Sequence, residues 1–270
     1  MLRRPFTLLV LLAAVLTARG HDFWIEADRF AVPVGQPVQL NLYVGQMLGV
    51  EEERPFGGDS LRRWQLVTAA GPTDMRLAAR PGLRPAPRLA LRQSGTHLLL
   101  QERGPLYVVL EPEKFETYLG EEGLEAIRDE RRRTGEAARP GRERYRRYLK
   151  AILHAGEAAG SPDDLATRPQ GQRFEIVPDT SPAQLKPGAT LSARVLLDGR
   201  PQPGVLVTLA QRPEARVARQ SARSDERGEV TFTVQERGLS LLRGVHMQRV
   251  EGAEDADWDS FWAACTFAVP

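Results

Sequence analysis

The sequence predicts a mainly β protein, in which immunoglobulin-like β-sandwich domains are accompanied by a two-helix insertion. Three observations lead to this prediction. Residues 30–110 and residues 174–269 both contain short apolar runs between clusters of Gly and Pro, and several of these runs alternate with polar residues. The section between them is instead rich in Glu, Arg, Leu and Ala at helical spacing.

Residues 1–20 are predicted to be a signal peptide. A pair of arginines precedes an apolar run at residues 8–16, and Ala18 and Gly20 supply the small residues that a signal peptidase requires. We expect cleavage directly before His21, with a cut after Ala18 as the alternative. Because the apolar run is too short to span a membrane, the expected product is an exported, periplasmic protein.

Residues 21–112 are predicted to form an N-terminal β domain. Its expected strands are short segments next to turn residues: part of residues 30–44, residues 61–68, residues 89–91, and the two strands of a hairpin within residues 94–110. Arg-Gly-Pro at residues 103–105 interrupts the apolar pattern, and we place the hairpin turn there.

Residues 113–172 are predicted to be a helical insertion followed by a linker. Residues 115–134 and 141–156 have the composition and spacing of two helices, and the second would pack an amphipathic face on the β domain. Residues 156–172 contain Gly, Ser, Pro and Asp in succession, which is typical of a linker.

Residues 173–270 are predicted to form a C-terminal immunoglobulin-like sandwich. About seven short segments occur at the spacing of such a sandwich. They are residues 174–178, 185–188, 191–197, 205–210, 229–234, 239–247 and 261–269. Turns are expected between them, for example at the Asp-Gly pair that begins with Asp198.

Composition excludes several classes of function. Without the three arginines of the signal peptide, about 34 basic side chains face 35 acidic ones, so we expect no nucleic-acid partner. Cys265 is the single cysteine, which rules out an intramolecular disulfide, and its apolar neighbours predict a buried thiol. The sequence has no Gly-x-Ser-x-Gly or His-Glu-x-x-His motif and no phosphate-binding glycine loop. We therefore expect a protein that is not an enzyme.

Six sequence motifs resemble the NikM-like family of exported proteins, which is associated with nickel and cobalt uptake. They are HDFWIE from His21, RERYRRY from Arg142, FEIVP from Phe174, DGRPQPG from Asp198, VHM from Val245 and DWDSFW from Asp257. The resemblance extends over nearly the whole mature chain. It implies a periplasmic, β-rich protein that binds or delivers a transition metal, with a membrane metal transporter as its partner.

The residues themselves point to a metal site at the mature N-terminus. A first residue His21 would offer its α-amine and its ring nitrogen Nδ1, which together close one chelate ring around a metal ion. His246 is the expected third nitrogen ligand, His97 is the second candidate, and Asp22 or Asp257 would complete the site. Nitrogen ligands of this kind suit nickel, cobalt or copper, and affinity would rise as the amine and imidazole lose protons near neutral pH.

Two alternatives remain open at this point. Copper monooxygenases that act on polysaccharides also place an N-terminal histidine on a β-sandwich, and Phe267 could serve as the axial aromatic residue of such a site. A metal-free adhesion or scaffold module is the other alternative, in which Trp24, Trp258 and Trp262 would be core or interface residues. For His154 we expect a structural role.

Overall fold

The computed structural model describes residues 20–78, 82, 84–85, 88–156, 164–213 and 217–270. The predicted signal sequence up to residue 19 and residues 157–163 of the predicted linker lie outside the described residues. Four β-sheets and two helices confirm the mainly β fold with sandwich packing. Within the described residues, no helix is long and apolar enough to cross a membrane.

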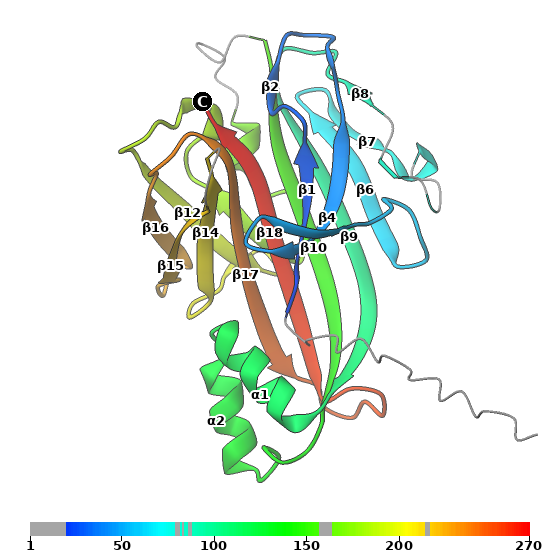
Figure 1. Cartoon of the computed structure of the whole chain (residues 1–270), viewed down its shortest axis with the longest axis vertical. Helices are drawn as coiled ribbons and strands as arrows, with labels where there is room; N and C mark the ends of the chain where they lie inside the picture. Colours follow the sequence, from blue (N-terminus) through cyan, green and yellow to red (C-terminus); the bar gives the residue numbers. More distant parts are fainter. Residues whose placement is uncertain (1–19, 79–81, 83, 86–87, 157–163, 214–216) are drawn as a thin grey trace, which may run out of the picture.

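A nine-stranded sheet runs through the middle of the molecule (Figure 1). Its order is β15-β14-β17-β18-β10-β9-β6-β7, and β2 also pairs with β10. All pairings are antiparallel except those of β10 with β18 and with β2. The strands are β2 (Ala31–Val32), β6 (Leu61–Thr68), β7 (Gly71–Asp74), β9 (Gly95–Leu110), β10 (Gly141–Ala155), β14 (Leu206–Arg212), β15 (Ala218–Arg223), β17 (Gly238–Arg249) and β18 (Trp258–Val269).

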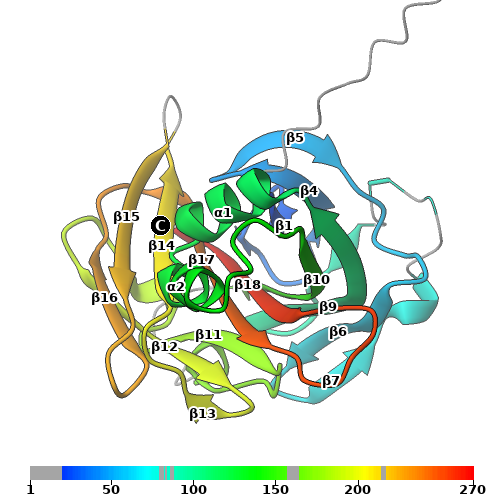
Figure 2. The same cartoon turned by 90° about the horizontal axis from the view of Figure 1, so that it is seen from below.

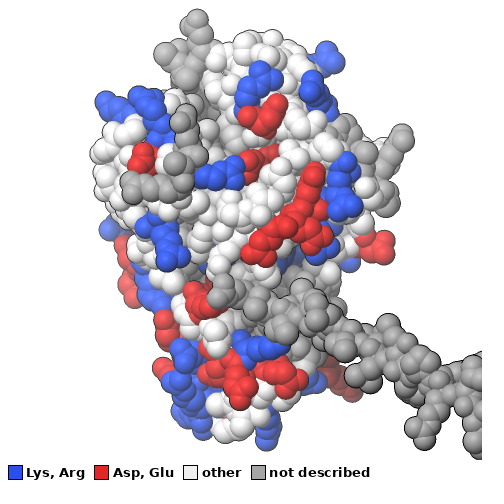
Figure 3. All heavy atoms as spheres, in the orientation of Figure 1, with Lys and Arg blue, Asp and Glu red and all other residues white. Residues whose placement is uncertain are grey.

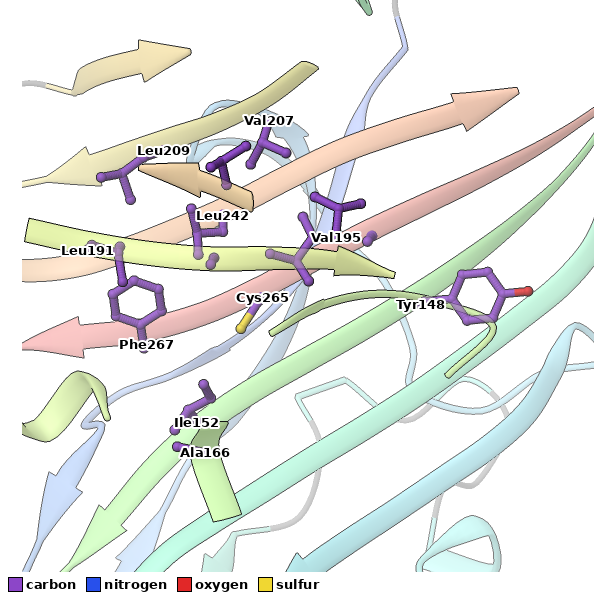
Figure 4. Close-up of a cluster of buried hydrophobic side chains, with 14 of the residues drawn as sticks. Tyr148, Ile152, Ala166, Leu191, Val195, Val207, Leu209, Leu242, Cys265 and Phe267 are labelled. Atoms are coloured by element: carbon purple, nitrogen blue, oxygen red, sulfur yellow. The ribbon is translucent and has the colours of Figure 1, made fainter. Parts of the chain in front are cut away.

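One face of this sheet, called here the closed face, is covered by a four-stranded sheet. That sheet consists of β11 (Phe174–Pro178), β12 (Thr190–Leu197), β13 (Arg200–Pro201) and β16 (Glu229–Thr233). The side chains between the two sheets form the largest apolar cluster, with Phe174, Leu191 and Phe267 fully buried in it. Figure 4 shows Cys265 among these side chains, as its apolar neighbours in the sequence predict.

The opposite face, called here the pocket face, is covered by three separate units. A three-stranded sheet of β1 (Asp22–Ala27), β4 (Leu40–Gln46) and β5 (Gly49–Glu53) lies over its middle. The pair β3 (Pro37–Val38) and β8 (Leu89–Ala90) adds a short ribbon. Helices α1 (Pro112–Glu121) and α2 (Glu125–Arg133) pack at the end of β17 and the start of β18 and bury Trp258 and Trp262. Figure 2 shows both layers on either side of the central sheet.

The prediction of a helix over residues 141–156 is wrong, because this segment is strand β10. It is central in the sheet, with β9 on one side and β18 on the other. Its alternate residues face opposite ways: Leu149 and Leu153 enter the core of the pocket face, whereas Tyr148 and Ile152 enter the core of the closed face. A strand that is apolar on both faces near one end has no simple period-2 pattern, so its sequence resembles that of an amphipathic helix.

Two further predictions are corrected by local geometry. The expected hairpin in residues 94–110 is one continuous strand, β9, with a register shift in its partner between Tyr145 and Arg147. Gly104 marks this irregularity, since a Cβ there would lie 2.8 Å from the Tyr145 carbonyl oxygen. The expected single helix over residues 115–134 is two helices. Gly123 has φ +70°, a conformation that ends the first helix and lets the chain turn into the second.

The predicted strands of the C-terminal section are largely confirmed. Six of the seven predicted segments contain a strand, whereas residues 185–188 form a turn after a short 3-10 helix. Strands β13 and β15 were missed because neither has an alternating apolar pattern. Strands from all three predicted segments, namely residues 21–112, 113–172 and 173–270, lie side by side in the central sheet.

Candidate functional site

A cavity of about 690 Å³ opens on the pocket face, between the start of β1, the end of β9, the start of β10 and helix α1. Its wall contains His21 together with aromatic side chains from three strands, among them Phe23, Tyr145 and Trp262. A volume of this size is typical of sites for small organic ligands. Figure 3 shows red spheres gathered near this region over β5, the strand that contains Glu51–Glu53.

His21 lies at the wall of the cavity and is held at two points. Its Nε2 is 2.9 Å from Oε2 of Glu51, and its side chain is 28% exposed. Its backbone carbonyl accepts a hydrogen bond of 2.9 Å from Nη1 of Arg147. The preceding residue, Gly20, is closely packed, since a Cβ there would lie 2.5 Å from Trp262. The start of β1 is therefore anchored in the structure.

Two arginines of the cavity wall are direct partners across neighbouring strands. Arg103 on β9 lies opposite Arg147 on β10. Both guanidinium groups stack over the Phe23 ring, at 5.6 Å and 5.3 Å from its centroid. Within the described part of the chain, no carboxylate lies within 4.0 Å of either guanidinium group, although Asp22 and Glu143 attract Arg147 from further away. Like charges placed opposite each other in a sheet are destabilising.

The guanidinium groups of Arg103 and Arg147 differ in their hydrogen-bond acceptors and in the aromatic rings that they contact. Arg103 donates to the backbone carbonyls of Pro55, Phe56 and Gly57. Burial, and then the positive charge of Arg147, lower the pKa of Arg103 to about 10. Burial also lowers the pKa of Arg147, whose guanidinium lies over the rings of Phe23, Tyr145 and Trp262.

A cluster of three buried charged residues, Arg243 with the carboxylates of Asp22 and Glu122, lies beside this cavity. Arg243 donates from Nε to Asp22 at 2.6 Å and lies 2.5 Å from Glu122 through Nη1. The other Asp22 oxygen accepts the backbone N–H of Met47 at 2.8 Å. Burial raises the pKa of Glu122, although Arg243 opposes that effect. Both oxygens of Asp22 are thus already in use, which leaves it poorly suited to bind a metal.

Glu143 is a buried carboxylate in the wall of the cavity. It accepts hydrogen bonds from the hydroxyl groups of Tyr118, at 3.1 Å, and of Ser260. Burial raises the pKa of Glu143 above its usual range. The Tyr118 ring in turn stacks on Trp262, with ring centroids 5.8 Å apart.

The structure does not bring the other predicted metal ligands to His21. His246 on β17 shares the closed face with Leu242, and its ring contacts Phe261 and Phe174 at 6.2 Å between centroids. Arg243, on the same strand, points to the other face, where it binds Asp22. His246 and His21 therefore lie on opposite sides of the central sheet.

His97 and Asp257 also lie elsewhere. His97 is 2% exposed, and its Nδ1 is 3.1 Å from the carbonyl oxygen of Gly95. It pairs with Leu153, six residues from Arg147 along β10, which is about 20 Å at strand spacing. Asp257 makes a two-pronged ion pair with Arg142, whose hydrogen bonds lower the pKa of that carboxyl.

The two remaining residues considered in the sequence analysis, Phe267 and His154, are both buried. Phe267 is fully buried in the core of the closed face, so it cannot serve as an axial residue at His21. His154 is 8% exposed near the far end of β10. Among the residues that the structure describes, no three His, Cys, Asp or Glu side chains form a group that could hold a metal ion.

Three residues of the site were not predicted from the sequence: Glu51, Arg103 and Arg147. A strand prediction for residues 141–155 places Tyr145 and Arg147 on the same face. This alternation is the sequence signal that could have identified Arg147. Glu51 is on β5, and His21 directly precedes β1, which does not pair with β5. No pattern among neighbouring residues in the sequence predicts this contact.

Comparison with known proteins gives a family but no activity. A family model described as "Domain of unknown function (DUF4198)" matches residues 18–248. No curated protein matches the sequence. One similar solved structure is the tetra-tandem repeat in the extending region of a large adhesion protein, at 9% identity and a TM-score of 0.24. That match covers 93% of this chain and 50% of the other, so the chain spans half of that structure.

Proposed function

We propose that this chain, which belongs to the DUF4198 family, is a periplasmic, non-enzymatic binding protein for a transition metal ion, with nickel, cobalt or copper as its cargo. The observation that carries the proposal is the orientation of His21, whose Nε2 is held by Glu51 at 2.9 Å. Histidines that bind metals commonly donate the other ring N–H to a carboxylate in this way.

Nδ1 of His21 is the nitrogen that this arrangement leaves for a metal. Removal of the predicted signal peptide would add the α-amine, at the place where Gly20 now joins His21. Both donors would then come from one anchored residue at the wall of the cavity. Two nitrogen donors from a single histidine suit nickel, cobalt or copper, and waters can complete the coordination.

The proposed ligand set is smaller than the sequence predicts. Asp22 is bound by Arg243 and by Met47, and His97 is buried far along the sheet. His246 faces the opposite side. A chelate from His21 alone favours capture and release over permanent storage, which is consistent with the NikM-like resemblance and with delivery to a membrane metal transporter.

The test is a titration of the exported protein with Cu(II) and with Ni(II), after mass spectrometry has established which residue comes first. We expect one ion per chain with sub-micromolar affinity. His21→Ala keeps the amine but removes the ring, so affinity should fall by about 100-fold or more. Glu51→Gln should weaken binding by about 10- to 100-fold, the usual effect of removing such a carboxylate.

His246→Ala is the matched control, because it removes an imidazole on the other side of the sheet. Its affinity should equal that of the unmodified protein. A protein that begins at His21 and binds neither ion would refute the proposal. An equal loss in the His21 and His246 variants would refute the assignment of the site to His21.

A further inference from the structure

The arginines of this protein fall into two groups. Most of the buried or half-buried ones lie against a carboxylate, as Arg131 does with Glu116 and Arg243 with Asp22 and Glu122. Arg103 and Arg147 form no such direct ion pair among the residues described, although Asp22 and Glu143 attract Arg147 from further away. The two arginines are nevertheless direct cross-strand partners. Two like charges placed next to each other in a sheet are destabilising, and an anion bound beside both of them would offset that cost.

The surroundings of Arg147 show where such an anion would bind. One of its nitrogens donates to the His21 carbonyl, and this is the one hydrogen bond of that side chain in the described structure. The guanidinium lies 5.0 Å from the ring centroid of Trp262 and 5.4 Å from that of Tyr145. Both rings and the guanidinium line the cavity. Its other donors are therefore available to a molecule in the cavity.

The rest of the wall indicates what kind of molecule fits. The aromatic residues Phe23, Tyr145 and Trp262 and the aliphatic residues Val108 and Leu110 offer flat and apolar surfaces. A cavity of about 690 Å³ is much larger than one inorganic ion requires. The planar, two-pronged donor set of an arginine suits a carboxylate.

We propose that this cavity binds a small organic carboxylate with a flat apolar body, with its carboxylate on Arg147 and Arg103 and its body against Phe23 and Trp262. The proposal does not depend on the metal site, because neither guanidinium group is a metal ligand. It gives the cavity a function of its own beside His21.

The test uses the exported protein, freed of metal with a chelator, and 2-naphthoate as the probe. Its neutral counterpart 2-naphthamide has the same ring system without the charge. Binding is followed by isothermal titration calorimetry and by tryptophan fluorescence, since Trp262 lies in the wall. We expect 2-naphthoate to bind at least about tenfold more tightly than 2-naphthamide, as charge-assisted hydrogen bonds allow.

Two variants assign the binding to the arginines. Arg147→Gln and Arg103→Gln should each weaken 2-naphthoate at least about tenfold and leave 2-naphthamide unchanged. Arg173→Gln is the matched control: Arg173 also stacks on an aromatic ring, 4.6 Å from the centroid of Phe261, but it lies outside the cavity. It should bind 2-naphthoate like the unmodified protein.

Three results would overturn the proposal. One is equal binding of the acid and the amide by the unmodified protein. Another is undiminished binding of 2-naphthoate in both arginine variants, with circular dichroism and thermal unfolding showing that they are folded. The third is binding of inorganic phosphate as tight as that of 2-naphthoate, which would make this a site for simple anions. A failed metal titration at His21 changes none of these readouts.

Discussion

Strand β10 carries a cation toward each face of the central sheet. Lys150 is buried and has a direct ion-pair partner, whereas Arg147 is half-buried and, among the described residues, has no carboxylate within 4.0 Å, which is what unmatched means below. On the closed face, Lys150 donates to Glu175 at 2.6 Å and to the carbonyl of Ile176. On the pocket face, three residues earlier, Arg147 has an arginine as its cross-strand partner. A matched buried charge holds the fold together, whereas an unmatched one beside a cavity is available to a ligand.

Loss of the matched charge should have the largest effect. Lys150→Met would leave Glu175 buried without its cation, both side chains being almost fully enclosed. The free energy of unfolding should fall by about 3–5 kcal/mol, measured by denaturant titration. Adding Glu175→Leu should restore most of the loss. If Lys150→Met changes stability by less than about 1 kcal/mol, the closed face does not depend on this pair.

Loss of the unmatched charge should affect stability far less. Arg147→Met removes the hydrogen bond to His21, the contacts with three rings and the longer-range attraction to Asp22 and Glu143, but it also removes the repulsion with Arg103. These effects oppose each other, so the free energy of unfolding should change by less than about 1 kcal/mol. A loss as large as that of Lys150→Met would show that Arg147 is mainly structural.

His246 on the closed face should make stability fall as the pH drops below neutrality. Burial lowers the pKa of His246 from 6.5 in the folded protein. The folded state therefore binds fewer protons than the unfolded state, and stability is full above pH 6.5 and is lost as pH falls below it. His246→Leu should flatten this part of the profile, measured by unfolding between pH 7.5 and pH 5. Identical profiles would contradict the burial of the ring.

The smallest effect concerns access of solvent to the two faces. Burial raises the pKa of Cys265 to about 11, so the thiol on the closed face should not react with iodoacetamide at pH 8 until the protein unfolds. Ser60→Cys places a matched thiol in the wall of the cavity, and that thiol should be labelled in the folded protein. Mass spectrometry distinguishes the two positions. Labelling of Cys265 in the folded protein would show that the closed face opens.

The sequence could predict those parts of the fold that depend on neighbouring residues. Leu61–Thr68 was predicted with its observed bounds, and Phe174–Pro178 likewise, because alternation or an apolar run between turn residues is a local signal. Strand β10 could not be predicted in this way, because its arginines look like the polar face of a helix. Their partners are far along the chain, as with Arg144 and Asp259.

For the candidate site, the sequence identified His21 and little more. His246 and His97 were predicted as further ligands only because imidazole is a good metal ligand. The sequence near each histidine does not show which face of the sheet it lies on, because that depends on how distant strands pack. The structure instead places Glu51 beside His21, from a strand that does not pair with β1. Sites assembled from separate strands depend on register and on the faces of the sheet.

The sequence by itself determined the mainly β class, most of the C-terminal strands and the apolar surroundings of Cys265, because hydrophobic pattern acts over a few residues. Only the tertiary structure decided which charges are matched. Pairing depends on strands such as β9, β10 and β18 coming together in one register. The packing of the four-stranded sheet on β10 placed Glu175 beside Lys150, and the register of β9 on β10 placed Arg103 opposite Arg147 in the wall of the cavity.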